Sequence, residues 1–128
     1  MQLEKSTHSA VKIMRHLHIY PEQGKASVIA KAVEISPQMV TRLATRLKRD
    51  GLVKFVPGRN GGFKLGRSAD EISFYDIFVA AQGELCISHC FISGICEADG
   101  HCKAHGYLQA MQDALMEDMM GVSLVDLV

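Results

Sequence analysis

A glycine-rich turn between two short apolar runs limits the possible folds more than any other feature of the chain. Residues 57–62 read Pro-Gly-Arg-Asn-Gly-Gly, and they separate β-type runs at residues 52–56 and 63–65. Proline and glycine at this density mark a turn, and a turn between two such runs is typical of a hairpin. The sequence therefore predicts one small β-hairpin in the middle of the chain.

Three helical patterns precede this hairpin. The first spans residues 7 to about 19 with Thr7 as its expected cap, and the second begins near Ser27. The third begins at Ser36, which is followed by a proline at the first helical position, and Gly51 ends it. The residues expected to face inward are Ala10, Ile13, Met14, Leu17, Ile29, Ala32, Val33, Val40, Leu43, Ala44 and Leu47.

Three helices followed by a hairpin predict a winged helix-turn-helix, a mainly α fold with a small β-hairpin. Ser73 is then expected to open a shorter helix that carries Ile77, Phe78 and Ala81 and ends at Gly83. We assign residues 1–84 to a DNA-binding domain of this type.

The remaining residues form two segments with different sequence patterns. Residues 85–106 hold all four cysteines and show no sustained period, which indicates a cysteine-rich loop. Residues 107–128 form a long C-terminal helix followed by a capped turn that starts at Ser123. The apolar residues of this helix recur at spacings of three or four residues, as in a coiled-coil seam. These seam residues are Leu108, Met111, Leu115, Met119 and Val122.

A single helix with such a seam needs a partner, and a homodimer is the simplest one. The alternative is that this helix packs back on the DNA-binding domain of its own chain (residues 1–84, hereafter the head).

Charge is divided sharply along the chain. Residues 1–67 hold thirteen of the 14 lysines and arginines and only four acids, a formal +9, whereas residues 68–128 hold one base and ten acids, a formal −9. Such asymmetry favours a polyanion as the partner of the first half. The plainer interpretation is a chance clustering of solvated side chains.

The chain shows neither an apolar run of membrane-spanning length nor a signal-peptide pattern, so a cytoplasmic protein without membrane contact is expected. In the reducing cytosol, four cysteines point to metal or redox chemistry rather than to structural disulfides.

The third helix carries the expected base-reading side chains, because Gln and Arg form bidentate contacts to base edges and Thr can touch a thymine methyl. These residues are Gln38, Thr41, Arg42 and Thr45. Arg46, Lys48 and Arg49 lie farther along and either touch phosphate or stay solvated.

The wing offers a second DNA contact. Arg59 and Asn60 lie at its tip and Lys64 lies behind them. An arginine among glycines on a projecting hairpin suits a narrow minor groove, and the alternative is an ordinary turn with a solvated arginine.

The cysteine pattern is the most informative feature of the second half. Cys90, Cys96 and Cys102 are separated by five residues each, and His105 follows. Structural zinc sites usually pair their ligands at C-x2–4-C spacing, and no C-x2-C pair occurs here. Iron–sulfur clusters are held by thiolates with histidine as a known substitute, but spacing alone leaves zinc and a thiol switch open.

Residues 51–53 read Gly-Leu-Val, residues 58–66 read Gly-Arg-Asn-Gly-Gly-Phe-Lys-Leu-Gly, and residues 72–77 read Ile-Ser-Phe-Tyr-Asp-Ile. These segments resemble the family of the bacterial IscR, NsrR and RirA regulators. The resemblance covers nearly the whole chain, including its opening Met-Gln-Leu. It implies dimeric winged-helix regulators of palindromic operators in double-stranded DNA. Many members are gated by an iron–sulfur cluster (4Fe–4S or 2Fe–2S), which NsrR members lose to nitric oxide.

The resemblance also implies a ligand set. Cys90, Cys96 and Cys102 fall on the family's cluster cysteines, and His105 falls where IscR-type proteins place a histidine ligand. NsrR-type proteins instead use an aspartate of the partner subunit, and the corresponding position here is His8. We favour His105 because it is local to the cysteines.

Two positions depart from the family pattern. Cys86 has no counterpart, and we expect it to be a small buried hydrophobe. The family's wings commonly carry an arginine where Pro57 stands, which leaves Arg59 as the one arginine of the tip.

We therefore expect a dimeric transcription regulator, a repressor, whose DNA binding is gated by an iron–sulfur cluster that senses nitric oxide, redox or iron status. The alternatives are a cluster-free regulator with a thiol–disulfide switch and a zinc-stabilised DNA-binding module. Enzyme activity is not expected, because no scaffold in the sequence holds a base beside a nucleophilic cysteine.

Overall fold

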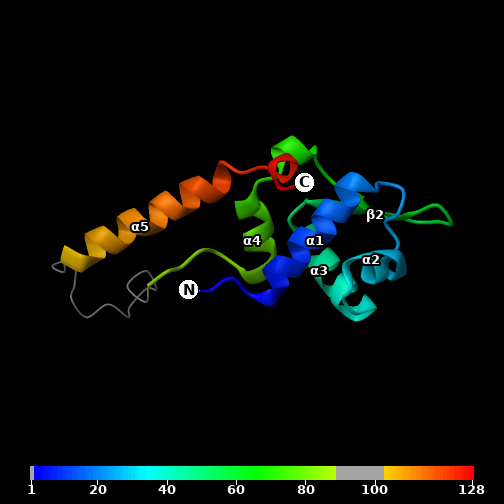
Figure 1. Ribbon diagram of the computed structural model, residues 1–128, viewed down its shortest axis with the longest axis horizontal. Coiled ribbons are helices and arrows are strands. Elements are labelled where there is room, and N and C mark those ends of the chain that lie inside the picture. The colour runs from blue at the N-terminus through cyan, green and yellow to red at the C-terminus, as the bar shows by residue number, and fades with distance from the viewer. Residues whose placement is uncertain (1, 89–102) are drawn as a thin grey trace.

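The fold was analysed in a computed structural model that describes residues 2–88 and 103–128 (Figure 1). The fold class is confirmed: the described residues form a mainly helical protein with one two-stranded antiparallel sheet. The elements in chain order are α1 (Lys5–Ile19), α2 (Ala26–Val33), α3 (Pro37–Arg49), β1 (Val53–Val56), β2 (Gly62–Leu65), the 3-10 helix η1 (Ala69–Glu71), α4 (Phe74–Gln82), α5 (Lys103–Met120) and the 3-10 helix η3 (Leu124–Leu127).

The core of the head lies between α1, α2, α3 and α4. All of the residues predicted to face inward from α1 and α3 are buried. The prediction for α2 is wrong at Ala32, which is exposed, whereas Ala30 is buried. Val33 lies four residues after Ile29 and three after Ala30, and these steps keep side chains on one side of a helix with a 3.6-residue period.

Local hydrogen bonds fix the helix starts that the sequence indicated. The Ser36 side chain accepts a hydrogen bond from the Met39 backbone N–H at 3.1 Å. Ser73 and Asp76 form a reciprocal capping box at the start of α4, which satisfies two N–H groups that the helix leaves unpaired. Thr7 is not a cap, because α1 begins at Lys5 and Thr7 lies inside the helix, buried, with its hydroxyl donating to the Gln82 side-chain oxygen.

The wing is anchored to the connection between α1 and α2. The Phe63 N–H donates to the Gly24 carbonyl at 2.7 Å, so this connection runs beside β2. A Cβ atom on Gly24 would lie 1.8 Å from the Phe63 carbonyl oxygen, and one on Gly62 would lie 2.6 Å from the Gly24 carbonyl carbon. Only glycine fits at both positions, and the close backbone contact fixes the root of the wing.

Helix α5 projects away from the head and is attached to it at one end (Figure 1). It begins at Lys103, four residues before the predicted start at Tyr107. Its last turns pack on α4, where Met119 forms a second buried cluster with Phe78 and Leu85. No helix in the described ranges is long and apolar enough to cross a membrane.

The residues after α5 return to the head. Leu124 is completely buried in the main core, and its N–H donates to the Ile72 carbonyl at 2.8 Å. The Phe74 N–H donates to the Val122 carbonyl at 2.7 Å. The C-terminal end of α5 is therefore held on both sides, by its own contacts with α4 and by this return.

Candidate nucleic-acid interface and sensor segment

Helix α3 separates its side chains into two faces. Val40, Leu43, Ala44 and Leu47 are buried. All four predicted base readers are exposed on the opposite side: Gln38, Thr41, Arg42 and Thr45. The Thr45 hydroxyl donates to the Thr41 carbonyl at 2.7 Å, so its hydrogen is used within the helix and its methyl group remains for contact. The outer face of α3 thus offers an amide, a guanidinium and two threonines to a groove.

The basic end of α3 divides into three different environments. Arg46 is half-buried, and its Nη1 donates to the Ala81 carbonyl at 2.8 Å. Arg46 is therefore not simply solvated, because one N–H of its guanidinium joins α3 to α4, and its phosphate contact stays a prediction. Arg49 pairs with Asp50 at 3.3 Å on the surface, and Lys48 is exposed.

The wing presents its polar tip to solvent. Arg59 and Asn60 are exposed, and Gly58 beside them has a φ of 106° that favours glycine. Lys64 lies lower on β2, half-buried, with its Nζ 3.4 Å from the Pro21 carbonyl oxygen. Lys54 lies directly across the sheet from Lys64. The sequence analysis missed Lys54, although pairing of the two predicted strands would have placed it there.

The three predicted cluster cysteines, Cys90, Cys96 and Cys102, lie outside the described residues. His105 lies in the first turn of α5 and is half-buried. His8 is exposed on the outer face of α1. The two candidates for a fourth ligand are therefore on different helices. Within the described ranges, no group of three His, Cys, Asp or Glu side chains is arranged to hold a metal ion.

Cys86 is exposed, so the prediction of a buried hydrophobe is wrong. Cys86 lies in the irregular segment after α4, beside a residue with the opposite burial. Leu85 points into the core and Cys86 points outward, where its thiol lies 3.2 Å from the Ser88 carbonyl oxygen.

The end of α4 is a junction between three helices, hereafter the α4 junction (Gln82, Ala81 and Arg46). The Gln82 side-chain oxygen accepts from the Glu4 N–H at 3.0 Å and from the Thr7 hydroxyl, and its nitrogen donates to the Gln2 carbonyl at 3.1 Å. The preceding carbonyl, that of Ala81, accepts from Arg46.

The segment that leaves the α4 junction is held as well. Gly83 follows with a φ of 98°, and the Ile87 N–H then donates to the Gln112 side chain of α5 at 3.1 Å. The path from α4 toward the cysteines is therefore tied to α1, α3 and α5. No sequence motif marks these contacts, because an amide and a backbone carbonyl have no characteristic spacing.

Comparison with known proteins gives matches along the whole chain. A profile of the Rrf2 family, described as an iron-dependent transcriptional regulator, matches residues 3–128. Protein aau3 of Rhizobium meliloti is 30% identical over 131 residues, which cover 100% of this chain and 85% of that protein. The transcriptional regulator NsrR of Halalkalibacterium halodurans is 25% identical and covers 94% of this chain and 90% of its own length.

Solved structures share the fold. The structure of CymR (YrzC), the global cysteine regulator of B. subtilis, matches with a TM-score of 0.79 at 23% identity, over 99% of this chain and 95% of that one. The structure of T. potens IscR matches with a TM-score of 0.76 at 22% identity, over 99% of this chain and 85% of that one.

Proposed function

The chain belongs to the Rrf2 family of transcriptional regulators, and on this premise we propose that it is a cytoplasmic, homodimeric repressor whose operator binding is gated by an iron–sulfur cluster. The outer face of α3 carries the DNA-binding part of this proposal, since it leaves the base-reading side chains in solvent on a rigid, well-packed helix.

In the proposed complex, α3 enters the major groove. Gln38 and Arg42 read base edges, and Thr41 and Thr45 supply hydroxyl and methyl contacts. Arg59 and Asn60 reach the neighbouring minor groove from the wing, while Lys54 and Lys64 approach phosphate. Two heads in a dimer read the two halves of a palindrome, about 34 Å apart or a multiple of it.

The donor set fits an iron–sulfur cluster. Cys90, Cys96 and Cys102 would supply three thiolates, and His105 would supply the fourth ligand from the first turn of α5. His8 of the partner subunit is the alternative, since its exposure on α1 leaves it accessible to a second chain. Such a cluster, when bound, is a group that nitric oxide, oxygen or iron shortage can remove from the protein.

The α4 junction is the proposed route from the cysteine segment to DNA. A rearrangement of the residues after Gly83 moves the end of α4, to which Gln82 and Ala81 belong. Arg46 transfers this movement to α3 through its hydrogen bond with the Ala81 carbonyl. Gln82 transfers it to the start of α1. Two states of this junction with different operator affinities make the regulation allosteric in the strict sense.

A cluster-free thiol–disulfide switch is the second candidate. The observation that favours it is Cys86, which is exposed and free in the structure and therefore accessible to an oxidant or to another thiol. A zinc-stabilised DNA-binding module is the third candidate and rests on the same cysteine and histidine donors.

Anaerobic purification distinguishes these candidates. The protein's ultraviolet–visible spectrum and its iron, sulfide and zinc contents are measured before and after a nitric oxide donor is added. The proposal expects a coloured, iron-containing protein that is bleached by the donor. Its affinity for duplexes selected from a random-sequence library should change with the loss of colour.

A colourless protein that cannot be reconstituted with iron and sulfide would exclude the cluster. A specific disulfide in the mass spectrum would then support the switch, and one zinc per chain would support the zinc module.

A further inference from the structure

One side of α5 is left without a partner in the described chain. Tyr107 is 68% exposed and Met111 is 45% exposed, although both lie in the middle of a helix. They are separated by four residues, so they lie above one another on the same side. Ala114 and Asp118 continue this stripe and are exposed as well. The predicted seam is thus divided, because Leu115 and Met119 pack on α4 while Met111 faces solvent. Tyr107, which lies outside the predicted seam, faces solvent as well.

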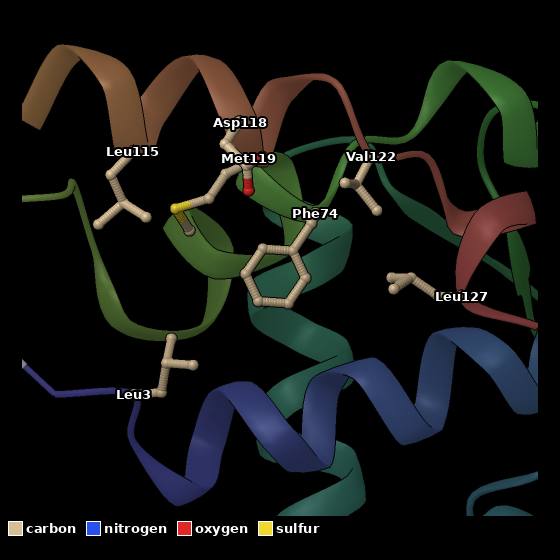
Figure 2. Close-up of a pocket in the computed structure, with 7 residues that line it drawn as sticks. All are labelled: Leu3, Phe74, Leu115, Asp118, Met119, Val122 and Leu127. Carbon is tan, nitrogen blue, oxygen red and sulfur yellow. The ribbon is translucent and has the colours of Figure 1, made fainter.

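A cavity opens beside the other end of the same helix. It has a volume of about 310 Å³ and lies between α5, α4, η3 and the segment before α1. Figure 2 shows the Phe74 ring near its centre, with Leu115 and Met119 above it, Leu127 at one side and Leu3 below. Its walls are apolar apart from Asp118. The cavity therefore suits a large side chain that is apolar along its length and can donate one hydrogen bond.

Tyr107 has these properties. Its ring is apolar, and a buried tyrosine hydroxyl usually finds a hydrogen-bond acceptor. Within one chain, Tyr107 lies eleven residues before Asp118 on a straight helix, about 16 Å away along the axis, and cannot reach its own cavity. A second copy can supply it, because a two-fold interface pairs each surface with the complementary one.

The positions of the exposed residues along α5 define the register of such a pairing. Two antiparallel α5 helices that cross near Asp113 set Tyr107 of one copy against Met119 of the other and Met111 against Leu115. Both pairs are centred on the same position, and each Tyr107 lies about 9 Å from the crossing point. The exposed stripe of each copy then covers the cavity of the other.

The charges on either side of the cavity are complementary as well. The outer face of α1 exposes Lys5, Lys12 and Arg15, and α5 exposes Asp113, Glu117 and Asp118. None of these six forms an ion pair within the described chain, so they remain available to a second copy. The acidic side of α5 in one subunit is thus complementary in charge to the basic outer face of α1 in the other.

We propose that the cavity beside Phe74 is a socket for Tyr107 of a second copy of this chain, with the tyrosine hydroxyl donating to Asp118. This inference rests on the proposed homodimer and deepens it, since it names the side chain that closes the interface. Each subunit provides one tyrosine and one socket, so a dimer contains the contact twice.

Sedimentation velocity of the full chain under reducing, anaerobic conditions tests this proposal. Tyr107→Ala should raise the dimer dissociation constant by about 30-fold or more, as expected for an aromatic anchor residue. Tyr107→Phe and Asp118→Ala should each raise it by up to about tenfold, and the double variant should be little worse than either one, because each removes one partner of the same hydrogen bond. Tyr20→Ala is the matched control, since Tyr20 is also half-exposed but lies at the far end of α1.

The outcomes separate this proposal from the homodimer itself. A monomeric wild-type protein would refute the proposed homodimer. A dimeric wild type that Tyr107→Ala leaves unchanged would refute the socket alone. An apolar fluorescent dye gives a second measurement: it should bind the Tyr107→Ala variant more strongly than the wild-type dimer. Equal binding would mean that the cavity stays open in the dimer, and would also overturn the proposal.

Discussion

Arg42 and Arg46 lie one turn apart on α3, yet their guanidinium groups have different tasks. Arg42 is exposed beside Gln38 and Thr41, whereas Arg46 is half-buried and bound to the Ala81 carbonyl. A four-residue step rotates the side chain by only about 40°, which is enough here to cross from the DNA-facing side to the contact with α4. Function and stability are therefore separable at neighbouring positions.

Arg42→Ala should weaken operator binding by roughly 1–3 kcal/mol, the usual contribution of a good base contact, and should leave the free energy of unfolding unchanged. Arg46→Ala should lower the free energy of unfolding by about 1–2 kcal/mol, because the Ala81 carbonyl loses a charged donor. Fluorescence anisotropy and urea denaturation measure the two effects. If Arg46→Ala unfolds like the wild type, the α4 junction does not contribute to stability.

Gly24→Ala should destabilise the protein by about 2 kcal/mol or more, because the new methyl group would overlap the Phe63 backbone and separate the wing from the head. Gly106→Ala is the matched control, since a Cβ there meets nothing within 4 Å and Gly106 lies inside α5. Alanine at this position should stabilise the protein by up to about 1 kcal/mol. Thermal unfolding of both variants checks the pair, and similar melting temperatures would contradict the proposed close contact.

At the scale of elements, α4 is short but touches most of the molecule. Its start carries the capping box and the return from α5, and its end carries the α4 junction. An element with contacts at both ends can move only if its neighbours move with it, which suits a helix that lies between a sensor segment and a recognition helix.

Gln82→Leu should loosen the start of α1, because Glu4 and Thr7 lose their acceptor. We expect faster hydrogen exchange at residues 4–8 and a loss of about 1–2 kcal/mol in the free energy of unfolding. Gln109→Leu is the control, since within residues 2–88 and 103–128 its amide is hydrogen-bonded to Asp113 of the same helix. Unchanged exchange in α1 would show that Gln82 does not hold this end.

The sequence was sufficient for features that depend on local chemistry. Ser36 and Ser73 start helices because their hydroxyls accept backbone N–H groups nearby, and residues 57–62 turn because of their composition. Sequence reasoning failed where groups far apart in the chain determine the role or the exposure of a residue. The roles of Thr7 and Arg46 depend on partners 75 and 35 residues away, and the exposure of Cys86 depends on how Leu85 enters the core. Neither spacing nor propensity contains that information.

At the scale of the whole molecule, the division of charge gives the head a single preferred partner. Residues 1–67 carry thirteen basic side chains and four acids, while α5 is acidic. The positive electrostatic potential of the head attracts a polyanion, and the negative charge of the rest of the chain keeps α5 away from that polyanion.

Operator affinity should fall steeply with salt as a result. The logarithm of the binding constant should decrease linearly with the logarithm of the salt concentration, with a slope of about −0.9 for each phosphate contacted. Lys54→Ala should reduce the slope by about two per dimer, because one proposed phosphate contact is lost in each head. Anisotropy titrations at several salt concentrations measure this. A slope that Lys54→Ala leaves unchanged would mean that Lys54 does not touch a phosphate of the operator.

The burial of Leu124 in the core of the head has a consequence for the newly synthesised protein. The recognition helix cannot be fully supported until the ribosome has translated α5 and the residues that follow it. A fragment released after Met120 would lack the side chain that fills the core beside Ile72. Incomplete translation products should therefore be poor competitors for the operator, so that DNA binding is confined to chains that also carry the sensor segment.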